Sequence, residues 1–308
     1  MHLESRIGLI LTTWLALTAA AIPAALADGV DEDAMVERVI RPDVVYGHKD
    51  GLAMTLDVFA PAAEPNGAGL LYMVSGGWYS RWAPPADWLP YFQPFLDAGY
   101  TVFAVRHGSS PRYSIPEAMA DVTRSVRFVR ANAAEFGVDP ARLAAMGNSA
   151  GGHLALVLGT QGDDGLESDD PVAQVSSRVQ AVVALVAPTD LTIAVWDAPE
   201  SQPEYRRFPA LDLAMDKAEV ASPLFDVTPD DAPSLLVMGG ADDLVPLLHG
   251  ERMAAAFDRE DVAHELVVIE DAGHGLGGAE NWPTVSSMAI DWLDRHLAPT
   301  AGSDRAAE

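Results

Sequence analysis

Residues 143–157 read LAAMGNSAGGHLALV, and this stretch decides the fold that we expect. The apolar residues before Gly147 have the composition of a short buried strand, and the residues after Gly151 are typical of the start of a helix. Between them, residues 147–151 match the pattern G-x-S-x-G, in which a sharp strand-to-helix turn exposes a serine hydroxyl. Small residues flank Ser149 because such a turn strains the backbone and leaves no space for side chains. The stretch therefore predicts a strand, a nucleophilic serine and a helix, in that order.

On either side of this stretch, apolar or β-branched runs alternate with helix-like segments. This alternation predicts an α/β fold, with a mostly parallel sheet covered by helices on both faces. One helix is predicted over residues 116–136, because apolar residues recur at three-four spacing from Met119 to Val129 and Gly137 follows as a stop. The eight predicted strands are residues 38–46, 52–60, 69–74, 100–106, 143–147, 179–186, 234–238 and 265–269.

Residues 1–27 have the pattern of a secretory signal peptide. Arg6 precedes an apolar run, and an A-x-A cleavage motif ends at Ala27. An uncleaved membrane anchor is the alternative, because Glu4 opposes the charge of Arg6. We expect the signal to be cleaved, the protein to be secreted or periplasmic, and no stable membrane insertion to remain.

The rest of the chain is expected to form one domain over residues 28–298, followed by a flexible tail over residues 299–308. Residues 188–232 separate two predicted strands and carry several aromatic residues and prolines, which is more than an ordinary connection needs. We interpret this segment as a lid or substrate-pocket insertion. Simple packing over the sheet is the alternative.

The composition excludes several classes of function. The chain has no cysteine, which excludes disulfides, thiolate metal sites and a cysteine nucleophile. Its formal net charge is −26 at pH 7, from 45 Asp and Glu against 19 Lys and Arg. A nucleic-acid partner is not expected, because phosphate binding needs a basic face. The excess of acid fits either a saline habitat, where salt screens the repulsion, or an acidic surface that aids solubility.

A serine hydroxyl becomes a good nucleophile when a histidine takes its proton and a carboxylate orients that histidine. His274 lies in a glycine-containing loop directly after the last predicted strand, and Asp242 directly follows the strand before it. Open α/β sheets place ligands at these carboxyl ends. We therefore predict Ser149 as nucleophile, His274 as base and Asp242 as the orienting acid. Asp243 and Asp190 are the alternatives for the acid.

The other histidines are weaker candidates for the base; among them, His296 fits a helix surface, and His48 and His264 precede predicted strands. His153 follows Ser149 by one helical turn and is expected to pack against the sheet. His107 ends a predicted strand and is a candidate pocket residue, while His249 fits a helix surface. None of them combines a strand end with a flexible loop as His274 does.

The tetrahedral intermediate of acyl transfer needs backbone N–H groups aimed at its oxyanion. Ala150, the residue after the nucleophile, is expected to supply one of them. Gly76 and Gly77 follow a predicted strand and can present their N–H groups with no side chain in the way. Trp78 comes next and is the predicted substrate-binding residue. An ordinary glycine turn is the alternative for this segment.

Together, these motifs resemble bacterial esterases of the acetylxylan and feruloyl esterase type, in the hormone-sensitive-lipase-like carboxylesterase branch of the α/β-hydrolases. The resemblance spans residues 38–297 and includes the segments 131–140, 187–191 and 241–246. It implies an α/β-hydrolase fold with an eight-stranded sheet and a small lid. The same frame serves short-chain esterases, polysaccharide deacetylases and amidases, so it does not specify the substrate.

One departure from the family stands beside the predicted oxyanion donors. The family motif reads His-Gly-Gly-x-Trp, and Val74 and Ser75 replace its first two residues here. Gly76, Gly77 and Trp78 are retained. The histidine that buttresses this loop in the family is therefore missing, and we expect lower activity or an altered loop geometry.

The residues and the resemblance predict a serine carboxylic-ester hydrolase that works through an acyl-enzyme, without metal or cofactor. The expected substrates are small-molecule or glycan esters, with short-acyl or feruloyl groups on carbohydrate. One alternative is a peptidase or amidase of the prolyl-oligopeptidase or arylformamidase type. The other is a catalytically silent α/β-hydrolase that binds a ligand, although an intact triad is hard to explain without chemistry.

Overall fold

A computed structural model of the protein describes residues 40–62 and 64–299. The predicted signal peptide over residues 1–27 and residues 300–308 of the predicted tail lie outside this part. None of the helices in the described part has both the length and the apolar character needed to cross a bilayer.

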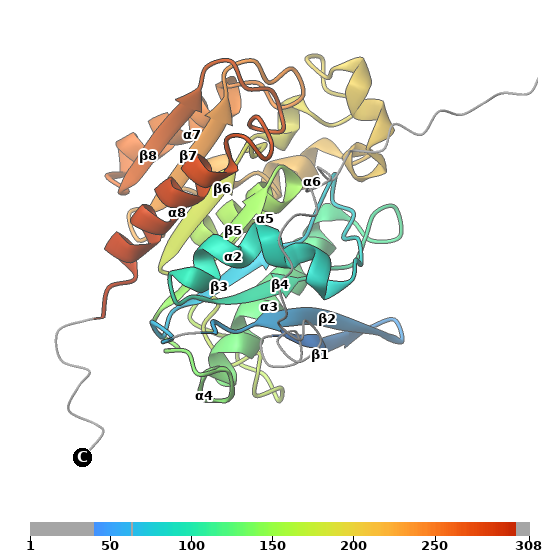
Figure 1. The fold of residues 1–308 in the computed structure, drawn as a ribbon. Helices are drawn as coiled ribbons and strands as arrows, with labels where there is room; N and C mark the ends of the chain where they lie inside the picture. Colours follow the sequence, from blue (N-terminus) through green and yellow to red (C-terminus); the bar gives the residue numbers. More distant parts are fainter. Residues whose placement is uncertain (1–39, 63, 300–308) are drawn as a thin grey trace, which may run out of the picture. The chain divides into compact units, whose positions relative to one another are not determined.

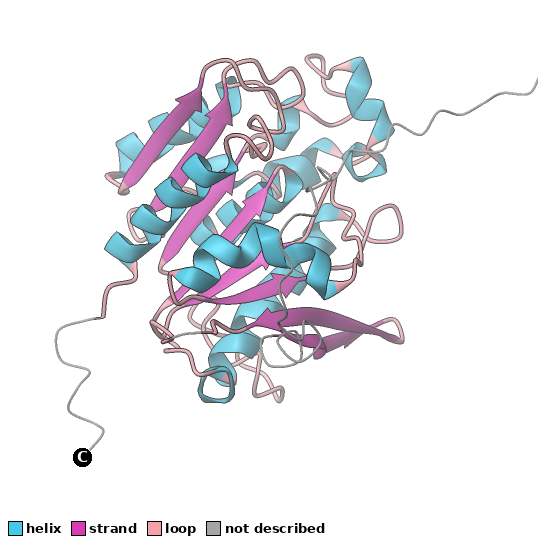
Figure 2. Cartoon of the chain, in the orientation of Figure 1, coloured by secondary structure: helices cyan, strands magenta, loops and turns pink. Residues whose placement is uncertain are grey.

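The described chain forms an eight-stranded sheet with helices on both faces (Figures 1 and 2). The strand order is β1-β2-β4-β3-β5-β6-β7-β8. β2 pairs antiparallel with β1 and with β4, and all other neighbours are parallel. This confirms the predicted mostly parallel sheet. The strands are β1 (Ile40–Lys49), β2 (Leu52–Phe59), β3 (Gly69–Met73), β4 (Thr101–Val105), β5 (Leu143–Asn148), β6 (Ala181–Leu185), β7 (Ser234–Gly239) and β8 (His264–Ile269).

The strands in the middle of the sheet are buried and consist mainly of apolar residues. Every residue of β3, β4, β6 and β7 is buried. Parallel strands that are covered on both faces need continuous apolar runs instead of alternating ones. At the antiparallel edge, β1 and β2 are joined at Asp50 and Gly51, which both have positive φ, as a two-residue hairpin turn requires.

The helices bury two separate apolar clusters, one against each face of the sheet. α3 (Ile115–Ala131), α5 (Ala150–Thr160) and α7 (Leu248–Glu260) contribute to one cluster. α2 (Leu89–Asp97), which follows the 3₁₀ helix η1 (Pro85–Trp88), and α8 (Trp282–His296) contribute to the other. Every residue of α5 is buried, so the helix that follows Ser149 has a fixed position.

The helix predicted over residues 116–136 is divided into α3 and the short α4 (Ala133–Phe136). The division lies at Asn132, whose side-chain amide donates to the carbonyl of Phe128 at 2.8 Å. This bond satisfies a terminal carbonyl of α3 and ends the helix. At its start, α3 has a capping box in which the Ser114 N–H donates to the Glu117 carboxylate at 2.9 Å.

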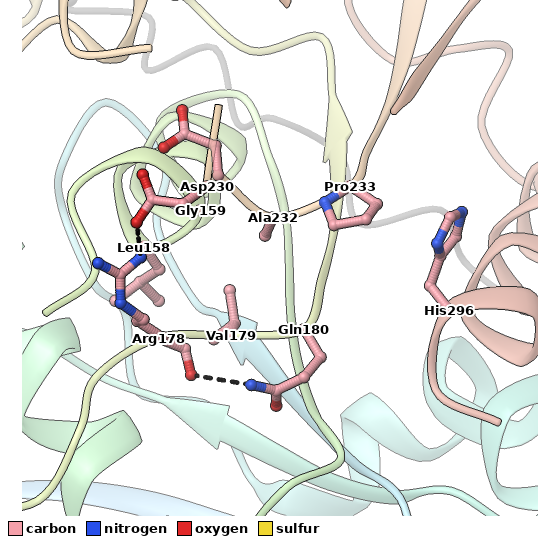
Figure 3. A pocket seen from close by; sticks show the side chains of 10 residues that line it. Leu158, Gly159, Arg178, Val179, Gln180, Asp230, Ala232, Pro233 and His296 are labelled. Atoms are coloured by element: carbon pink, nitrogen blue, oxygen red, sulfur yellow. Dashed lines mark hydrogen bonds and ion pairs between the residues drawn. The ribbon is translucent and has the colours of Figure 1, made fainter. Parts of the chain in front are cut away.

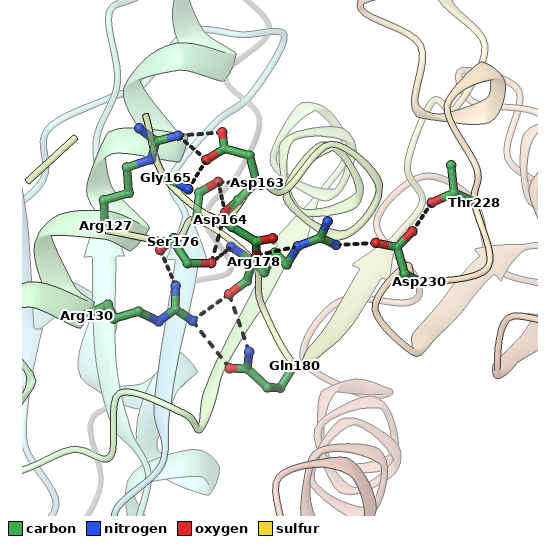
Figure 4. A network of polar contacts seen from close by, with 11 residues as sticks. Arg127, Arg130, Asp163, Asp164, Gly165, Ser176, Arg178, Gln180, Thr228 and Asp230 are labelled. Atoms are coloured by element: carbon green, nitrogen blue, oxygen red, sulfur yellow. Dashed lines mark hydrogen bonds and ion pairs between the residues drawn. The ribbon is translucent and has the colours of Figure 1, made fainter. Parts of the chain in front are cut away.

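The connection between α5 and β6, residues 161–180, contains no helix or strand and is fixed by arginines (Figure 4). Arg127 of α3 donates to the carboxylate of Asp163 at 2.6 Å, and Arg178 pairs with Asp164 at 3.0 Å. A charge-assisted hydrogen bond holds its partners more strongly than a neutral one. The Arg127 pair therefore keeps the connection against α3, and the Arg178 pair joins two parts of the connection itself.

The predicted insertion over residues 188–232 consists of short elements joined by side-chain hydrogen bonds. Trp196 Nε1 donates to the carbonyl of Tyr205 at 3.0 Å, and the Tyr205 hydroxyl donates to the carbonyl of Leu244 at 2.9 Å. The second bond ties the insertion to the loop after β7. The elements are η2 (Leu191–Ile193), η3 (Pro203–Arg207), η4 (Pro209–Leu211), α6 (Met215–Val220) and η5 (Pro223–Phe225).

Candidate active site

Ser149 occupies a strained turn between β5 and α5. Its backbone has φ 55° and ψ −121°, a conformation that costs a non-glycine residue on the order of 1–3 kcal/mol. The glycines around it make this turn possible. A Cβ atom on Gly147 would lie 2.3 Å from the backbone of Gly151, and one on Gly151 would lie 2.4 Å from the carbonyl oxygen of Met73. The sequence therefore places the serine hydroxyl at the carboxyl edge of the sheet.

The structure brings together Ser149, His274 and Asp242, which the sequence predicted as a triad. Ser149 Oγ lies 2.9 Å from His274 Nε2, and His274 Nδ1 lies 2.8 Å from Asp242 Oδ2. The ionised carboxylate only accepts, so Nδ1 carries the ring proton of neutral His274. Nε2 then has a free lone pair that accepts the hydrogen bond from the serine hydroxyl. This is the arrangement in which a histidine acts as a general base.

Asp242 is held rigidly beneath the histidine. Its side chain is fully buried, and Oδ1 accepts the backbone N–H groups of Leu244 and Val245, both at 2.9 Å. With His274 Nδ1, the carboxylate therefore has three donors around it, which compensates for its burial. By contrast, 22% of the His274 side chain is exposed, so solvent reaches part of the imidazole.

The loops that carry Asp242 and His274 touch because β7 ends in a glycine, Gly239. A Cβ atom on Gly239 would lie 2.4 Å from the carbonyl oxygen of Ala272. Backbone hydrogen bonds then join the loops, including one of 2.9 Å from Ala241 N–H to the same carbonyl. Asp242 and His274 are 32 residues apart in the sequence, and they meet because each follows one of two neighbouring strands, β7 and β8.

The two alternative acids lie elsewhere. Asp190 is buried, but its carboxylate binds Arg252 at 2.8 Å and the backbone N–H of Thr192 at 3.0 Å. Asp243 is exposed to solvent beside Asp242. Among the described residues, Asp242 is the carboxylate that the structure joins to His274.

The two glycines predicted as oxyanion donors, Gly76 and Gly77, differ in the hydrogen bonding of their N–H groups. The Gly76 N–H donates to the carbonyl of Tyr79 at 3.0 Å, so it is already used. Within residues 40–62 and 64–299, the N–H groups of Gly77 and Ala150 donate no hydrogen bond to another backbone group. These two groups are the ones that remain for an oxyanion.

A small apolar cavity of about 30 Å³ opens beside Ser149. The insertion between β6 and β7 forms one wall of it with Tyr205 and Phe208, and Trp78 forms another. The ring of Phe208 packs directly on the oxyanion segment, since a Cβ atom on Gly77 would lie 2.5 Å from its Cδ1. Residues of the insertion therefore line this cavity, and Phe208 limits the space next to the nucleophile.

Trp78 is buried at 4% exposure, and its indole is fixed by His153. Trp78 Nε1 donates to His153 Nδ1 at 3.2 Å, while His153 Nε2 donates to the carbonyl of Ala221 at 2.6 Å. Burial lowers the pKa of His153 to about 4, which keeps the ring neutral and its Nδ1 free to accept. The expected packing role of His153 is thus confirmed, and its bond to Trp78 has no signal in the sequence.

Two expectations for other histidines are wrong. His249, expected on a helix surface, is buried because its Nδ1 accepts the N–H of Thr189 at 3.2 Å. His107, a candidate pocket residue, is absent from the cavity lining and instead binds the hydroxyl of Ser75 at 2.8 Å. No group of three or more metal-binding side chains occurs within the described ranges.

A second cavity, of about 320 Å³, lies at the opposite edge of the sheet (Figure 3). Its lining includes Gln180 and Pro233, which precede β6 and β7, so it lies at the amino ends of these strands. Ligands of open α/β sheets bind at the carboxyl ends instead. Burial raises the pKa of its Asp231 to about 6, but no serine lines this cavity. The candidate active site is therefore the smaller cavity at Ser149.

Comparisons with a family model and with individual relatives agree on one family of proteins. The model of the BD-FAE family matches residues 56–257 of the chain. The chain is 30% identical over 278 residues to the probable carboxylic ester hydrolase LipM, and 28% identical over 271 residues to the esterase LipC, both of Mycobacterium tuberculosis. These matches cover 85% and 82% of the chain but 63% and 64% of the relatives. The chain thus spans less than two thirds of their length.

Solved structures share the fold. A thermophilic esterase from the Planctomycetes species Thermogutta terrifontis superposes with a TM-score of 0.68 at 26% identity, over 84% of this chain and 94% of that one. A truncated carbohydrate esterase from gut microbiota superposes with a TM-score of 0.72 at 22% identity, over 84% and 96%. The predicted α/β-hydrolase fold is therefore confirmed.

Proposed function

Since the chain belongs to the BD-FAE family, we propose that it is a serine carboxylic-ester hydrolase. The observation that carries this proposal is that His274 forms hydrogen bonds to both Asp242 and Ser149. The bond to Asp242 measures 2.8 Å and the bond to Ser149 measures 2.9 Å. The similarity to LipM, LipC and the Thermogutta esterase supports the class of reaction.

In the first half of the reaction, Ser149 Oγ attacks the carbonyl carbon of the ester while His274 Nε2 takes the hydroxyl proton. Asp242 stabilises the imidazolium that forms. The carbonyl oxygen becomes an oxyanion and accepts hydrogen bonds from the N–H groups of Gly77 and Ala150. When the intermediate collapses, the ester C–O bond breaks and His274 gives its proton to the leaving alcohol. The acyl group remains on Ser149.

In the second half, water replaces the alcohol. His274 takes a proton from the water, whose oxygen attacks the acyl carbonyl, and the same two N–H groups hold the second oxyanion. Collapse returns the proton to Ser149 Oγ and releases the carboxylic acid. Because 22% of the His274 side chain is exposed, water has access to the base in this step.

The cavity favours a short acyl group over a feruloyl group. A water-sized group needs on the order of 10–15 Å³, so about 30 Å³ has room for roughly two such groups. An acetyl group fits this space. The phenyl-propenoyl skeleton of a feruloyl ester is several times larger, and Tyr205 and Phe208 stand in its way.

We propose a carbohydrate as the alcohol part of the substrate. Tyr79 and Trp82 are 53% and 58% exposed on the segment that follows Trp78, and their aromatic faces are suited to stacking against a sugar ring. The Tyr79 backbone is joined to Gly76 by two hydrogen bonds of 3.0 Å, so the residue that carries this ring is held beside the oxyanion segment. The fold similarity to a carbohydrate esterase agrees with this proposal.

The test is hydrolysis of p-nitrophenyl acetate by the wild-type chain and by Ser149→Ala. We expect kcat to fall by a factor that reaches about 10⁶ in the variant. Ser286→Ala removes a buried serine hydroxyl from α8 and is the matched control, with activity unchanged. A panel of acyl esters and aminoacyl amides separates an esterase from the amidase alternative. Equal activity of wild type and Ser149→Ala would contradict the proposal.

A further inference from the structure

The oxyanion segment of this chain lacks the histidine that the family motif places at its start. Val74 stands there, and its side chain is 5% exposed and packs in the apolar cluster with α2 and α8. An isopropyl group makes no hydrogen bond, so another contact has to hold the segment. The next residue, Ser75, also departs from the motif, and it provides a hydroxyl where the family has glycine.

His107, which follows β4, meets this hydroxyl. His107 Nε2 lies 2.8 Å from Ser75 Oγ, and His107 Nδ1 lies 2.8 Å from the carbonyl oxygen of Gly108. A carbonyl only accepts, so Nδ1 carries the proton and Nε2 accepts the bond from the Ser75 hydroxyl. The imidazole is 5% exposed, so little water competes for this bond.

The segment that carries His107 is itself fixed against the oxyanion segment. The Ser110 N–H donates to the carbonyl of Trp78 at 3.0 Å, and Ser109 Oγ accepts the N–H of Ser80 at 2.9 Å. Behind it, the Gly108 N–H donates to Asp121 at 2.8 Å. Residues 107–110 therefore lie beside residues 75–80 and hold them by hydrogen bonds.

We propose that His107 is a positioning residue for the oxyanion hole, and that it takes over through Ser75 the role of the missing family histidine. By holding the Ser75 hydroxyl it fixes the backbone that leads to Gly77, and thereby the direction of the Gly77 N–H. This inference rests on the proposed esterase function. It predicts that His107 acts on the transition state and leaves the binding of the ester ground state unchanged, because the oxyanion forms only in the reaction.

Two substitutions of His107 separate the functions of its ring nitrogens. His107→Gln places an amide oxygen near the position of Nε2 and keeps the acceptor for Ser75. His107→Asn reaches only the position of Nδ1 and loses that acceptor. Removal of a whole oxyanion donor costs about 10²–10³ in kcat, so a displaced donor is expected to cost roughly 10–100-fold. We expect this loss for His107→Asn and for Ser75→Ala, and a loss below about threefold for His107→Gln.

The readouts are kcat, KM, and the inhibition constant of a boronic acid that forms a tetrahedral adduct on Ser149. For His107→Asn we expect kcat to fall, KM to stay, and the boronic acid to bind weaker in proportion to kcat. The double variant Ser75→Ala/His107→Asn should lose no more than either single variant. His264→Asn is the matched control, because the His264 ring bonds a backbone carbonyl far from Ser149, at the start of β8.

Three results would overturn the inference while leaving the esterase proposal intact: equal activity of His107→Asn and wild type, equal losses in His107→Gln and His107→Asn, or additive losses in the double variant. If Ser149→Ala keeps full activity, the esterase proposal itself fails. The two failures are therefore distinguishable in one set of assays.

Discussion

Phe208 closes the cavity beside Ser149, and its truncation should change which acyl groups the protein accepts. In Phe208→Ala, the benzyl side chain that packs on Gly77 is replaced by a methyl group, and the cavity of about 30 Å³ opens toward the insertion. A butyryl group has two more methylene groups than an acetyl group. At about 0.8 kcal/mol for each methylene that becomes buried, the gain is about 1.6 kcal/mol, or roughly 15-fold in kcat/KM.

The assay compares kcat/KM for p-nitrophenyl butyrate and p-nitrophenyl acetate. We expect the ratio of butyrate to acetate to rise about 15-fold in Phe208→Ala relative to wild type. Phe225→Ala is the control, because Phe225 lies in the same insertion, is 51% exposed and does not line the cavity. An unchanged ratio in folded Phe208→Ala would refute the assignment of Phe208 as the residue that limits acyl length.

Three further predictions concern the triad, the buried histidines and the amino-terminal segment. Asp242→Asn should lower kcat by about 10⁴, because the amide no longer selects the required tautomer of His274; near-full turnover would exclude Asp242 as the acid. Burial lowers the pKa of His153 and of His249 to about 4, whereas the unfolded chain binds these protons near pH 6.5. Stability is therefore complete above pH 6.5 and falls as the pH drops toward 4, by up to roughly 1.4 kcal/mol per pH unit for each histidine. Urea unfolding across this window measures the slope, which His153→Gln should reduce; a flat profile contradicts this reasoning. Amino-terminal sequencing of the exported protein should find Asp28 first, and an intact residue 1 in the medium would contradict a cleaved signal.

The fold was predictable because its decisive signals are local. The apolar run of β5, the glycines around Ser149 and the buried residues of α5 are consecutive in the sequence, and each has one physical explanation. Asp242 and His274 were predictable for a related reason, since strand ends in a parallel sheet gather at one edge. The division of the predicted helix at Asn132 was not, because it depends on a side-chain bond that competes with the helical pattern.

The remaining features of the site depend on contacts between distant segments. Gly76 was predicted as an oxyanion donor because no side chain obstructs the N–H group of a glycine. The sequence does not show which glycine N–H forms a hydrogen bond within the turn. The bond between Ser75 and His107 joins residues that are 32 positions apart. His249 lies two residues before Glu251 and Arg252 begin a charged stretch, and its burial follows from the packing of α7 beside residue 189. No periodicity or motif in the sequence indicates such tertiary contacts.

The most direct test of the central claim is to trap the acyl-enzyme. Wild-type protein and the variants Ser149→Ala and His274→Ala are mixed with p-nitrophenyl acetate and quenched in acid, and their peptides are analysed by mass spectrometry. We expect an acetyl group on Ser149 in the wild type, none at that peptide in Ser149→Ala, and a strongly reduced amount in His274→Ala. Hydrolysis by the wild type with no acetyl group on Ser149, or equal labelling in His274→Ala, would contradict a serine esterase that works through this triad.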